Sequence, residues 1–279
     1  MQSWKHTSFS GRNTISEKND EPVKLHHKGS LMPKIIFLGT NGWYDTTTGN
    51  TICILVDTSS YTIILDAGNG IAKLGKYVDF NKPAYLFLSH FHLDHIVGLH
   101  TICKYTFSRG LWICGQEGIA TILGKILDAP FTIPVKDLPF DTRFVELPLQ
   151  KDQLPFSVVS LPLLHASLTM GYRLEVDDKI ITFCGDTGYC DNAVKLAESA
   201  DLLIAECAFK PGQENINWPH LNPETAARIA KESGAKRLAL VHFDAEMYKT
   251  MEERKNAQDV AQKIFPDTVA TVDDMVIDI

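Results

Sequence analysis

The stretch SHFHLDH, residues 89–95, directly follows the apolar run AYLFL and places three imidazoles and one carboxylate within six residues. In an extended segment His90 and His92 point to the same side, because side chains alternate with a period of two. Asp94 and His95 come after the turn and can face a second position close by. Imidazole nitrogens and carboxylate oxygens are the ligands that borderline divalent metals prefer, whereas capping a helix needs only one polar residue. The stretch therefore predicts a metal site at the end of a buried strand.

Four further polar residues stand at the ends of apolar runs or beside a helix. His165 follows SVVSLPLL, Asp186 follows IITFCG, His242 follows RLALV, and His220 shortly precedes the helix PETAARIA. Singly, each has an ordinary explanation as a buried histidine, a turn aspartate or a residue flanking a helix. Strand carboxyl ends, however, converge on one edge of an α/β sheet. The shared placement predicts that these side chains join the first cluster.

The composition is that of a folded globular protein with an acidic surface. The 279 residues include 27 basic and 34 acidic side chains, a net charge of −7, and 44% are hydrophobic. This balance argues against a generally nucleic-acid-binding surface. The six cysteines lack C-x-x-C spacing, which favours reduced thiols and predicts a cytoplasmic location. No window approaches the roughly 18 apolar residues of a membrane span, so no membrane partner is expected.

The chain divides into a polar start and one long folded part. Residues 1–31 lack either hydrophobic period and are predicted to be a flexible N-terminal tail. Residues 32–279 alternate β-rich runs with helical segments and contain no long linker, which predicts a single domain. The strands fall into two groups, each followed by helices, and this favours an α/β fold with a four-layer αββα sandwich. Helices are expected near 71–77, 96–107, 116–127, 191–198 and 223–233. The expected strands include KIIFLG, TICILVD, YTIILD, AYLFL, RFVEL, FSVVSL, MGYRLEV, KIITFC, DLLIAE and RLALVHF.

The order of these elements resembles a known family. H-x-H-x-D-H, then a lone histidine, then G-D-T at residues 185–187, then a late histidine after an apolar strand is similar to the metallo-β-lactamase-fold hydrolases. The resemblance runs from about Lys34 to the C-terminus. Its ending, with Glu206 after a strand, His220 before PETAARIA and His242 in Val-His-Phe, looks like the ribonuclease Z group and its phosphodiesterase relatives.

The resemblance implies two divalent metal ions, with zinc expected first and manganese or iron left open. It assigns His90, His92 and His165 to one metal, Asp94, His95 and His242 to the other, and Asp186 to a bridge between them. It also implies a catalytic group of His220, Glu206 and Asp94, in which His220 acts on the leaving oxygen or the developing charge and Glu206 orients it. For Asp66, in DAGNG, the sequence leaves two alternatives open, an orienting partner of a ligand histidine and a turn residue.

The chain departs from the ribonuclease Z group at two places. That group carries a Gly/Pro- and Lys-rich arm for transfer RNA before the G-D-T turn, whereas here only Asp177, Asp178 and Lys179 separate MGYRLEV from IITFCGDT. The segment after His242 reads FDAEMY, where the processing enzymes tend to have Ser and Arg. Both departures, with the net charge, count against a nucleic acid partner.

The expected function is therefore that of a dinuclear phosphodiesterase, acting on a small or cyclic phosphodiester through a metal-bridging hydroxide. The alternatives are a carbon-centred hydrolase of the same fold (lactonase, thioesterase or β-lactamase-like) and a ribonuclease Z-like endoribonuclease. A non-enzymatic sensor is disfavoured because degenerate family members usually lose ligands and all seven are present. The expected partner is a small-molecule phosphodiester, and a homodimer is left open.

Overall fold

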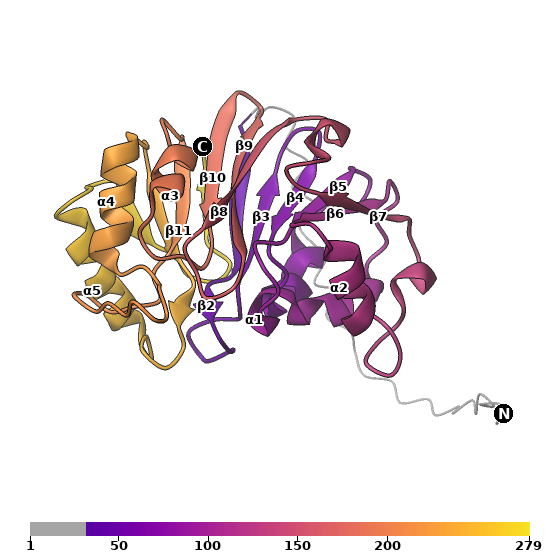
Figure 1. Ribbon diagram of the computed structural model, residues 1–279, viewed down its shortest axis with the longest axis horizontal. Helices are drawn as coiled ribbons and strands as arrows, with labels where there is room; N and C mark the ends of the chain where they lie inside the picture. The colour runs from indigo at the N-terminus through magenta and orange to yellow at the C-terminus, as the bar shows by residue number, and fades with distance from the viewer. Residues whose placement is uncertain (1–31) are drawn as a thin grey trace, which may run out of the picture. The chain divides into compact units, whose positions relative to one another are not determined.

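A computed structural model describes residues 32–279, so the predicted flexible tail at residues 1–31 lies outside the described residues. The described chain folds into two main β-sheets with helices on the outer faces (Figure 1). The first sheet contains β1 (Lys34–Gly39), β3 (Cys53–Asp57), β4 (Thr62–Leu65), β5 (Ala84–Phe87), β6 (Leu111–Gly115), β7 (Thr142–Glu146) and β15 (Val276–Asp278). Their order is β15-β1-β3-β4-β5-β6-β7.

The second sheet has the order β14-β12-β11-β10-β9-β8. It is built from β8 (Ser157–Leu163), β9 (Thr169–Val176), β10 (Lys179–Cys184), β11 (Leu202–Glu206), β12 (Leu238–Val241) and β14 (Thr268–Ala270). Strands β4 to β7 run parallel in the first sheet, and β10, β11, β12 and β14 run parallel in the second. As predicted, a two-residue turn, Asp177-Asp178, joins β9 to β10.

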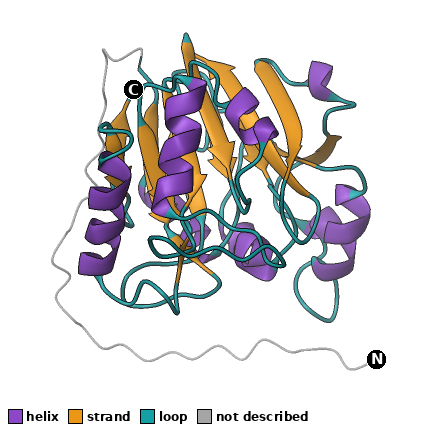
Figure 2. Cartoon of the chain, turned by 60° about the vertical axis from the view of Figure 1, so that its left-hand side comes forward, coloured by secondary structure: helices purple, strands orange, loops and turns teal. Residues whose placement is uncertain are grey.

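Alternation along the strands explains the layers. In β11, Leu202 and Ile204 face the core between the two sheets, whereas Leu203 and Ala205 face a second core under helices. The outer core of the second sheet includes residues of α3 (Asp191–Leu196), α4 (Pro223–Ser233) and α5 (Met251–Gln262). The outer core of the first sheet is covered by the helices on its other side (Figure 2). The predicted four-layer αββα sandwich is therefore confirmed.

The helices that cover the first sheet are short, and two of them are 3₁₀ helices. They are α1 (Leu93–Ile96), α2 (Ile119–Ile126) and the 3₁₀ helices η1 (Asn69–Lys76) and η2 (Val97–Lys104), while η3 (Val135–Asp137) and η4 (Lys151–Gln153) lie in later loops. The helix expected near 96–107 is present as the 3₁₀ helix η2, which ends at Lys104, and a break after Ile96 separates it from α1. Ala67 N–H donates to His95 O at 2.7 Å and Gly98 N–H donates to Ala67 O at 2.9 Å. These bonds to a distant loop replace bonds that a continuous helix would make.

Two further features were not foreseen from the sequence. No strand was assigned to LWICG, which forms β6 between β5 and β7. Two-residue strands β2 (Asn41–Gly42) and β13 (Phe243–Asp244) pair in parallel beside His242. None of the helices within residues 32–279 is long and apolar enough to cross a membrane.

Candidate functional site

The predicted ligands lie at the carboxyl ends of strands from both sheets. The segment after β5 carries His90, His92, Asp94 and His95, while His165 follows β8, Asp186 follows β10 and His242 follows β12. The structure brings all seven together with Glu206 and His220. They form three groups, His90/His92/His165/Asp186, Asp94/His95/His242 and Asp186/Glu206/His220, and within each group the ligand atoms lie within 4.8 Å of one another. The sequence-based expectation of convergence on one edge is therefore met, although metal coordination itself stays a prediction.

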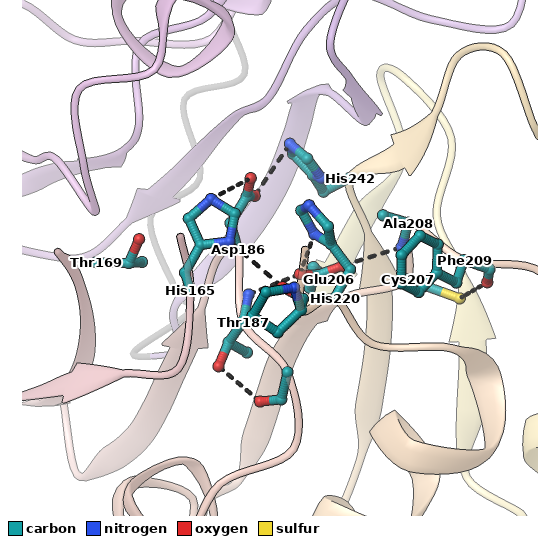
Figure 3. Close-up of polar contacts among 12 residues, drawn as sticks. His165, Thr169, Asp186, Thr187, Glu206, Cys207, Ala208, Phe209, His220 and His242 are labelled. Carbon is teal, nitrogen blue, oxygen red and sulfur yellow. Dashed lines mark hydrogen bonds and ion pairs between the residues drawn. The ribbon is translucent and has the colours of Figure 1, made fainter. Parts of the chain in front are cut away.

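Asp186 lies at the centre of the cluster, and its two oxygens face different sets of imidazoles. Oδ1 lies 3.2 Å from His95 Nε2 and 3.1 Å from His242 Nε2. Oδ2 lies 3.7 Å from His90 Nε2 and 3.7 Å from His165 Nε2. Figure 3 shows Asp186 between His165 and His242. A carboxylate has two oxygens to share. Its placement is the one that the predicted bridge requires.

Hydrogen bonds on the outer nitrogens aim the first set of imidazoles at Asp186. His165 Nδ1 lies 3.3 Å from Pro219 O. Because a carbonyl can only accept, Nδ1 carries the hydrogen and Nε2 keeps a lone pair directed inward. On the outer side, His90 Nδ1 lies 3.0 Å from Ser89 Oγ, and His92 Nε2 lies 3.5 Å from Ser167 Oγ. On the inner side, His92 Nδ1 faces His165 Nε2 at 3.5 Å. The three rings are thus held with nitrogens converging on one point.

The second set is oriented by Asp66, which directly follows β4. Asp66 Oδ2 lies 2.7 Å from His95 Nδ1, and Asp66 Oδ1 accepts a hydrogen bond from Ser89 N–H at 2.7 Å. Asp66 therefore orients a predicted ligand, which is one of the two alternatives that the sequence left open. His95 Nε2 then faces His242 Nε2 at 3.0 Å, and Asp94 Oδ2 lies 3.3 Å from the same His242 atom. Such outer hydrogen bonds are typical of metal-binding histidines.

Unpaired buried atoms show that the residues fit a cation. Within residues 32–279, His90 Nε2 is buried without a hydrogen-bond partner, and Asp186 Oδ1 is buried without a hydrogen bond of good geometry, although two ligand imidazoles lie 3.1–3.2 Å from it. Buried polar atoms are nearly always paired, and an exception calls for an unseen water or ion. Here the unpaired atoms belong to a converging set of imidazoles and carboxylates, which is the donor chemistry of zinc, manganese and iron sites. The donor set therefore fits the divalent cations that the sequence predicts.

The protonation states of the imidazoles reflect burial and the central carboxylate. Burial, with the neighbouring His95, lowers the pKa of His90 to about 2, so that this ring is neutral and able to bind metal. Burial also lowers the pKa of His92 and His165. For His95 and His242, burial opposes protonation, but the carboxylates of Asp186 and Asp94, joined at His95 by Asp66, together outweigh it and raise the pKa. A bound cation would therefore take the place of the protons on His95 and His242.

His220 and Glu206 form a hydrogen-bonded pair beside the cluster (Figure 3). His220 Nδ1 lies 2.7 Å from Glu206 Oε1, and the His220 ring centroid lies 5.0 Å from that of His165. Burial disfavours the charged imidazolium, but the charge of Glu206 and its hydrogen bond raise the pKa of His220 to about 9. Since Nδ1 is engaged by Glu206, Nε2 is the nitrogen that can donate a proton into the site.

Sequence reasoning missed two residues that shape this site from the β2 segment. Trp43 N–H donates to Asp94 Oδ2 at 2.7 Å, so a main-chain group helps to hold this carboxylate. Gly42 lies against the face of the His242 ring, where an added Cβ would come within 2.4 Å of Cε1. Both contacts join residues far apart in the sequence, and no local pattern in TNGWY, residues 40–44, predicts them. The glycine is needed for its small size.

Substituting Gly42 with alanine is expected to displace His242 and to remove the metal of the Asp94/His95/His242 group. The methyl group needs space that the imidazole fills, and a well-packed site yields only by shifting the ring. Elemental analysis after reconstitution should show a fall from about two metal ions to about one per chain.

The matched control is Gly124→Ala, because Gly124 is exposed in α2 and an added Cβ would meet nothing within 4 Å. This change should leave metal content as it is and stabilise the helix by about 0.5–1 kcal/mol. Full metal occupancy and activity in Gly42→Ala would show that the His242 ring is not a ligand held by this contact.

Comparison with protein families places most of the folded chain within one known domain type. Residues 61–243 match the model of the Beta-lactamase superfamily domain. The probable metallo-hydrolase YhfI of Bacillus subtilis (strain 168) is 28% identical over 215 residues, covering 75% of this chain and 86% of that protein. Ribonuclease Z of Bacillus licheniformis is 26% identical over 306 residues, covering 86% of this chain and 97% of that enzyme.

Solved structures show the same fold. The crystal structure of the metallo-beta-lactamase fold protein YhfI from Bacillus subtilis superposes with a TM-score of 0.73 at 25% identity, covering 89% of this chain and 100% of that one. Human tRNase Z, short form, superposes with a TM-score of 0.69 at 23% identity, covering 88% of this chain and 98% of that one. At that identity the second likeness concerns the fold alone.

Proposed function

The chain belongs to the beta-lactamase superfamily as one of its metallo-hydrolases, and on that premise we propose that it hydrolyses small or cyclic phosphodiesters at a dinuclear metal centre. The observation that carries the proposal is the His220–Glu206 pair beside a complete set of predicted ligands. Phosphodiester cleavage uses such a pair to protonate the departing alkoxide.

The metals would be held by the two sets described above, with His90, His92 and His165 on one, Asp94, His95 and His242 on the other, and Asp186 between them. Two divalent cations, expected to be zinc, would supply Lewis-acid activation of water and neutralise charge on the phosphate oxygens. The protein's own groups orient these ligands through Asp66, Ser89 and the main chain of Trp43. The hydrogen bond from Trp43 N–H holds the carboxylate of Asp94, which belongs to the predicted catalytic group.

His220 would act on the oxygen that leaves phosphorus. A phosphodiester releases an alkoxide, which is a poor leaving group unless it receives a proton as the bond breaks. The raised pKa of His220 keeps the imidazolium protonated at neutral pH, and Glu206 holds Nδ1 so that Nε2 faces the site. The thiolate released from a thioester needs little help of this kind, whereas a lactone also releases an alkoxide and is distinguished from a phosphodiester by the substrate comparison below.

Two features favour a small substrate over a long RNA: the negative net charge of the protein and the short turn between β9 and β10. Long RNA is bound through many Lys and Arg contacts to phosphate, whereas this chain has a net charge of −7. The relatives named ribonuclease Z support phosphodiester chemistry, but a two-residue turn stands between β9 and β10, where the processing enzymes are expected to insert their arm. A cytoplasmic location and a possible homodimer stay predictions.

The decisive experiment compares substrates with one metal-loaded sample. The set contains bis-p-nitrophenyl phosphate, a 2′,3′-cyclic nucleotide, a precursor transfer RNA, a lactone, a thioester and nitrocefin. We expect turnover of both small diesters and poor cleavage of the precursor. Efficient cutting of the precursor at its 3′ junction with poor turnover of the small diesters would favour the endoribonuclease alternative, and preferred hydrolysis of the lactone, thioester or nitrocefin would favour the carbon-centred one.

Replacing Glu206 with glutamine is expected to lower both activity and stability. Glu206 is fully buried, and besides His220 its oxygens accept hydrogen bonds from Thr187 N–H at 2.6 Å and Ala208 N–H at 3.0 Å. The amide NH₂ of glutamine would oppose one of these donors, and a buried donor without an acceptor costs about 1–3 kcal/mol. Turnover should fall less than on removal of His220, because the imidazole remains in place.

Thermal unfolding and kcat of this variant should be measured beside those of Glu214→Gln, a change at an exposed carboxylate in the loop that follows β11. The control should leave both quantities unchanged. If Glu206→Gln were as stable and as active as the unaltered protein, Glu206 would have no role in holding His220.

A further inference from the structure

A tryptophan stands directly at the predicted metal ligands, on the loop between β11 and α4. Trp218 is 48% exposed. Its indole lies parallel to the His92 ring, with 6.0 Å between centroids and an interplanar angle of 8°. It also meets the His165 ring edge-on at 5.6 Å and lies 6.1 Å from the His220 ring. One indole thus touches two predicted ligands and the predicted acid while leaving half of its surface to solvent.

The loop that carries this indole is held in place by its own hydrogen bonds. Trp218 N–H donates to Asn215 O at 3.3 Å, and Asn217 N–H donates to Asn215 Oδ1 at 3.0 Å. The next carbonyl, Pro219 O, is the partner of His165 Nδ1. The position of Trp218 is therefore coupled to that of a predicted ligand, and the exposed indole is part of the site's wall.

Exposed apolar side chains occur close to His165 and Trp218 in the chain. Leu164 and Leu168, which flank His165 in the chain, are 50% and 56% exposed, and Ile216 in the Trp218 loop is 93% exposed. Within residues 32–279, no lysine or arginine makes an ion pair, hydrogen bond or cation–π contact with a predicted ligand, with His220 or with Trp218. The parts of a substrate that extend beyond the phosphate would therefore be bound by apolar contact.

We propose that Trp218 is a stacking platform for a planar aromatic substituent of the phosphodiester, a nucleobase or an aryl ring, and this rests on the proposed function. A substrate phosphate among the ligands would have its substituents within reach of the indole, because the indole contacts the same rings. An exposed aromatic face binds planar rings of many kinds by stacking, without hydrogen-bond readout. The site would then prefer cyclic nucleotides to cyclic phosphates of bare sugars.

The test compares adenosine 2′,3′-cyclic phosphate with 1-O-methylribose 2′,3′-cyclic phosphate, which differ in the base alone. Trp218→Ala should raise the KM for the nucleotide about 10-fold or more beyond any change for the base-free analogue, the size expected for loss of one stacked base. Trp218→Phe should recover part of the difference, because it restores a ring. Phe131→Ala, which removes an exposed aromatic side chain from the loop after α2, should leave both KM values unchanged.

A binding measurement keeps this test separate from the proposed function. Quenching of tryptophan fluorescence by the nucleotide, but not by the base-free analogue, is expected for the unaltered protein and lost in Trp218→Phe. Metal content of each variant should be measured, since an unchanged content shows that the ligands stay in place. Equal quenching in Trp218→Phe, or equal affinity for the two ligands, would overturn the platform even if both are hydrolysed. Quenching without hydrolysis would leave the platform standing and refute the phosphodiesterase.

Discussion

Replacing Asp186 with alanine is expected to remove both metal ions and, with them, the activity. Asp186 directs one oxygen to each set of imidazoles, at 3.1–3.2 Å on one side and 3.7 Å on the other. Without its charge the two cations would repel each other at short range with less negative charge between them. The loss of affinity should exceed the roughly 10–100-fold that follows removal of an outer hydrogen-bond partner of a ligand.

Elemental analysis and isothermal titration with zinc should be applied to this variant and to Asp191→Asn. Asp191 is an exposed carboxylate five positions further along the chain, at the start of α3. This control separates loss of a bridge from loss of negative charge in general, and it should keep its metals. Full metal content in Asp186→Ala would contradict the bridging role and the dinuclear centre as drawn.

Replacing His220 with alanine is expected to lower turnover of a cyclic nucleotide by about 10²–10⁴-fold, the usual range for a general acid. Metal content should stay nearly unchanged, because His220 is paired with Glu206 and is not among the seven predicted ligands. The loss should depend on the leaving group. With bis-p-nitrophenyl phosphate, whose phenolate departs with little help from a proton, the loss should be about tenfold or less.

This comparison of leaving groups distinguishes an acid from a residue that merely shapes the site. An equal loss on both substrates would assign His220 to substrate positioning. A loss of metal in His220→Ala would show that the Asp186/Glu206/His220 group, whose ligand atoms also lie within 4.8 Å of one another, itself holds a cation.

Much of the site could be predicted because its chemistry is concentrated in short stretches at strand ends. His90, His92, Asp94 and His95 are neighbours in the sequence, and period-two alternation already places two of them on one side. Asp186 and His242 follow apolar runs that are long enough to be recognised as buried strands. The Asp177-Asp178 turn is likewise a local signal, and the structure places it between β9 and β10.

The remaining parts of the site depend on contacts between distant segments, which leave little trace in one sequence. Gly42 is small because the His242 ring lies above it, and Trp43 matters through its main-chain N–H. The break between α1 and η2 follows from hydrogen bonds with the loop around Ala67, not from any helix-breaking residue at Ile96. The hydrogen bonds that Glu206 accepts from the main-chain N–H groups of Thr187 and Ala208 could likewise not be predicted from the sequence.

The division of the ligands between the two sheets has a consequence for how the protein matures. His165 stands 73 positions beyond His92, and His242 stands 147 positions beyond His95. The early segment alone therefore completes neither ligand set, whatever metal it meets during synthesis. Because domains fold as units once their chain is available and a preformed metal site rarely exists in an unfolded chain, metal capture should come last. Metal ions bound by ligands from both sheets would then stabilise the packing of the two sheets against each other. Metal content would therefore report the fraction of the protein that has folded.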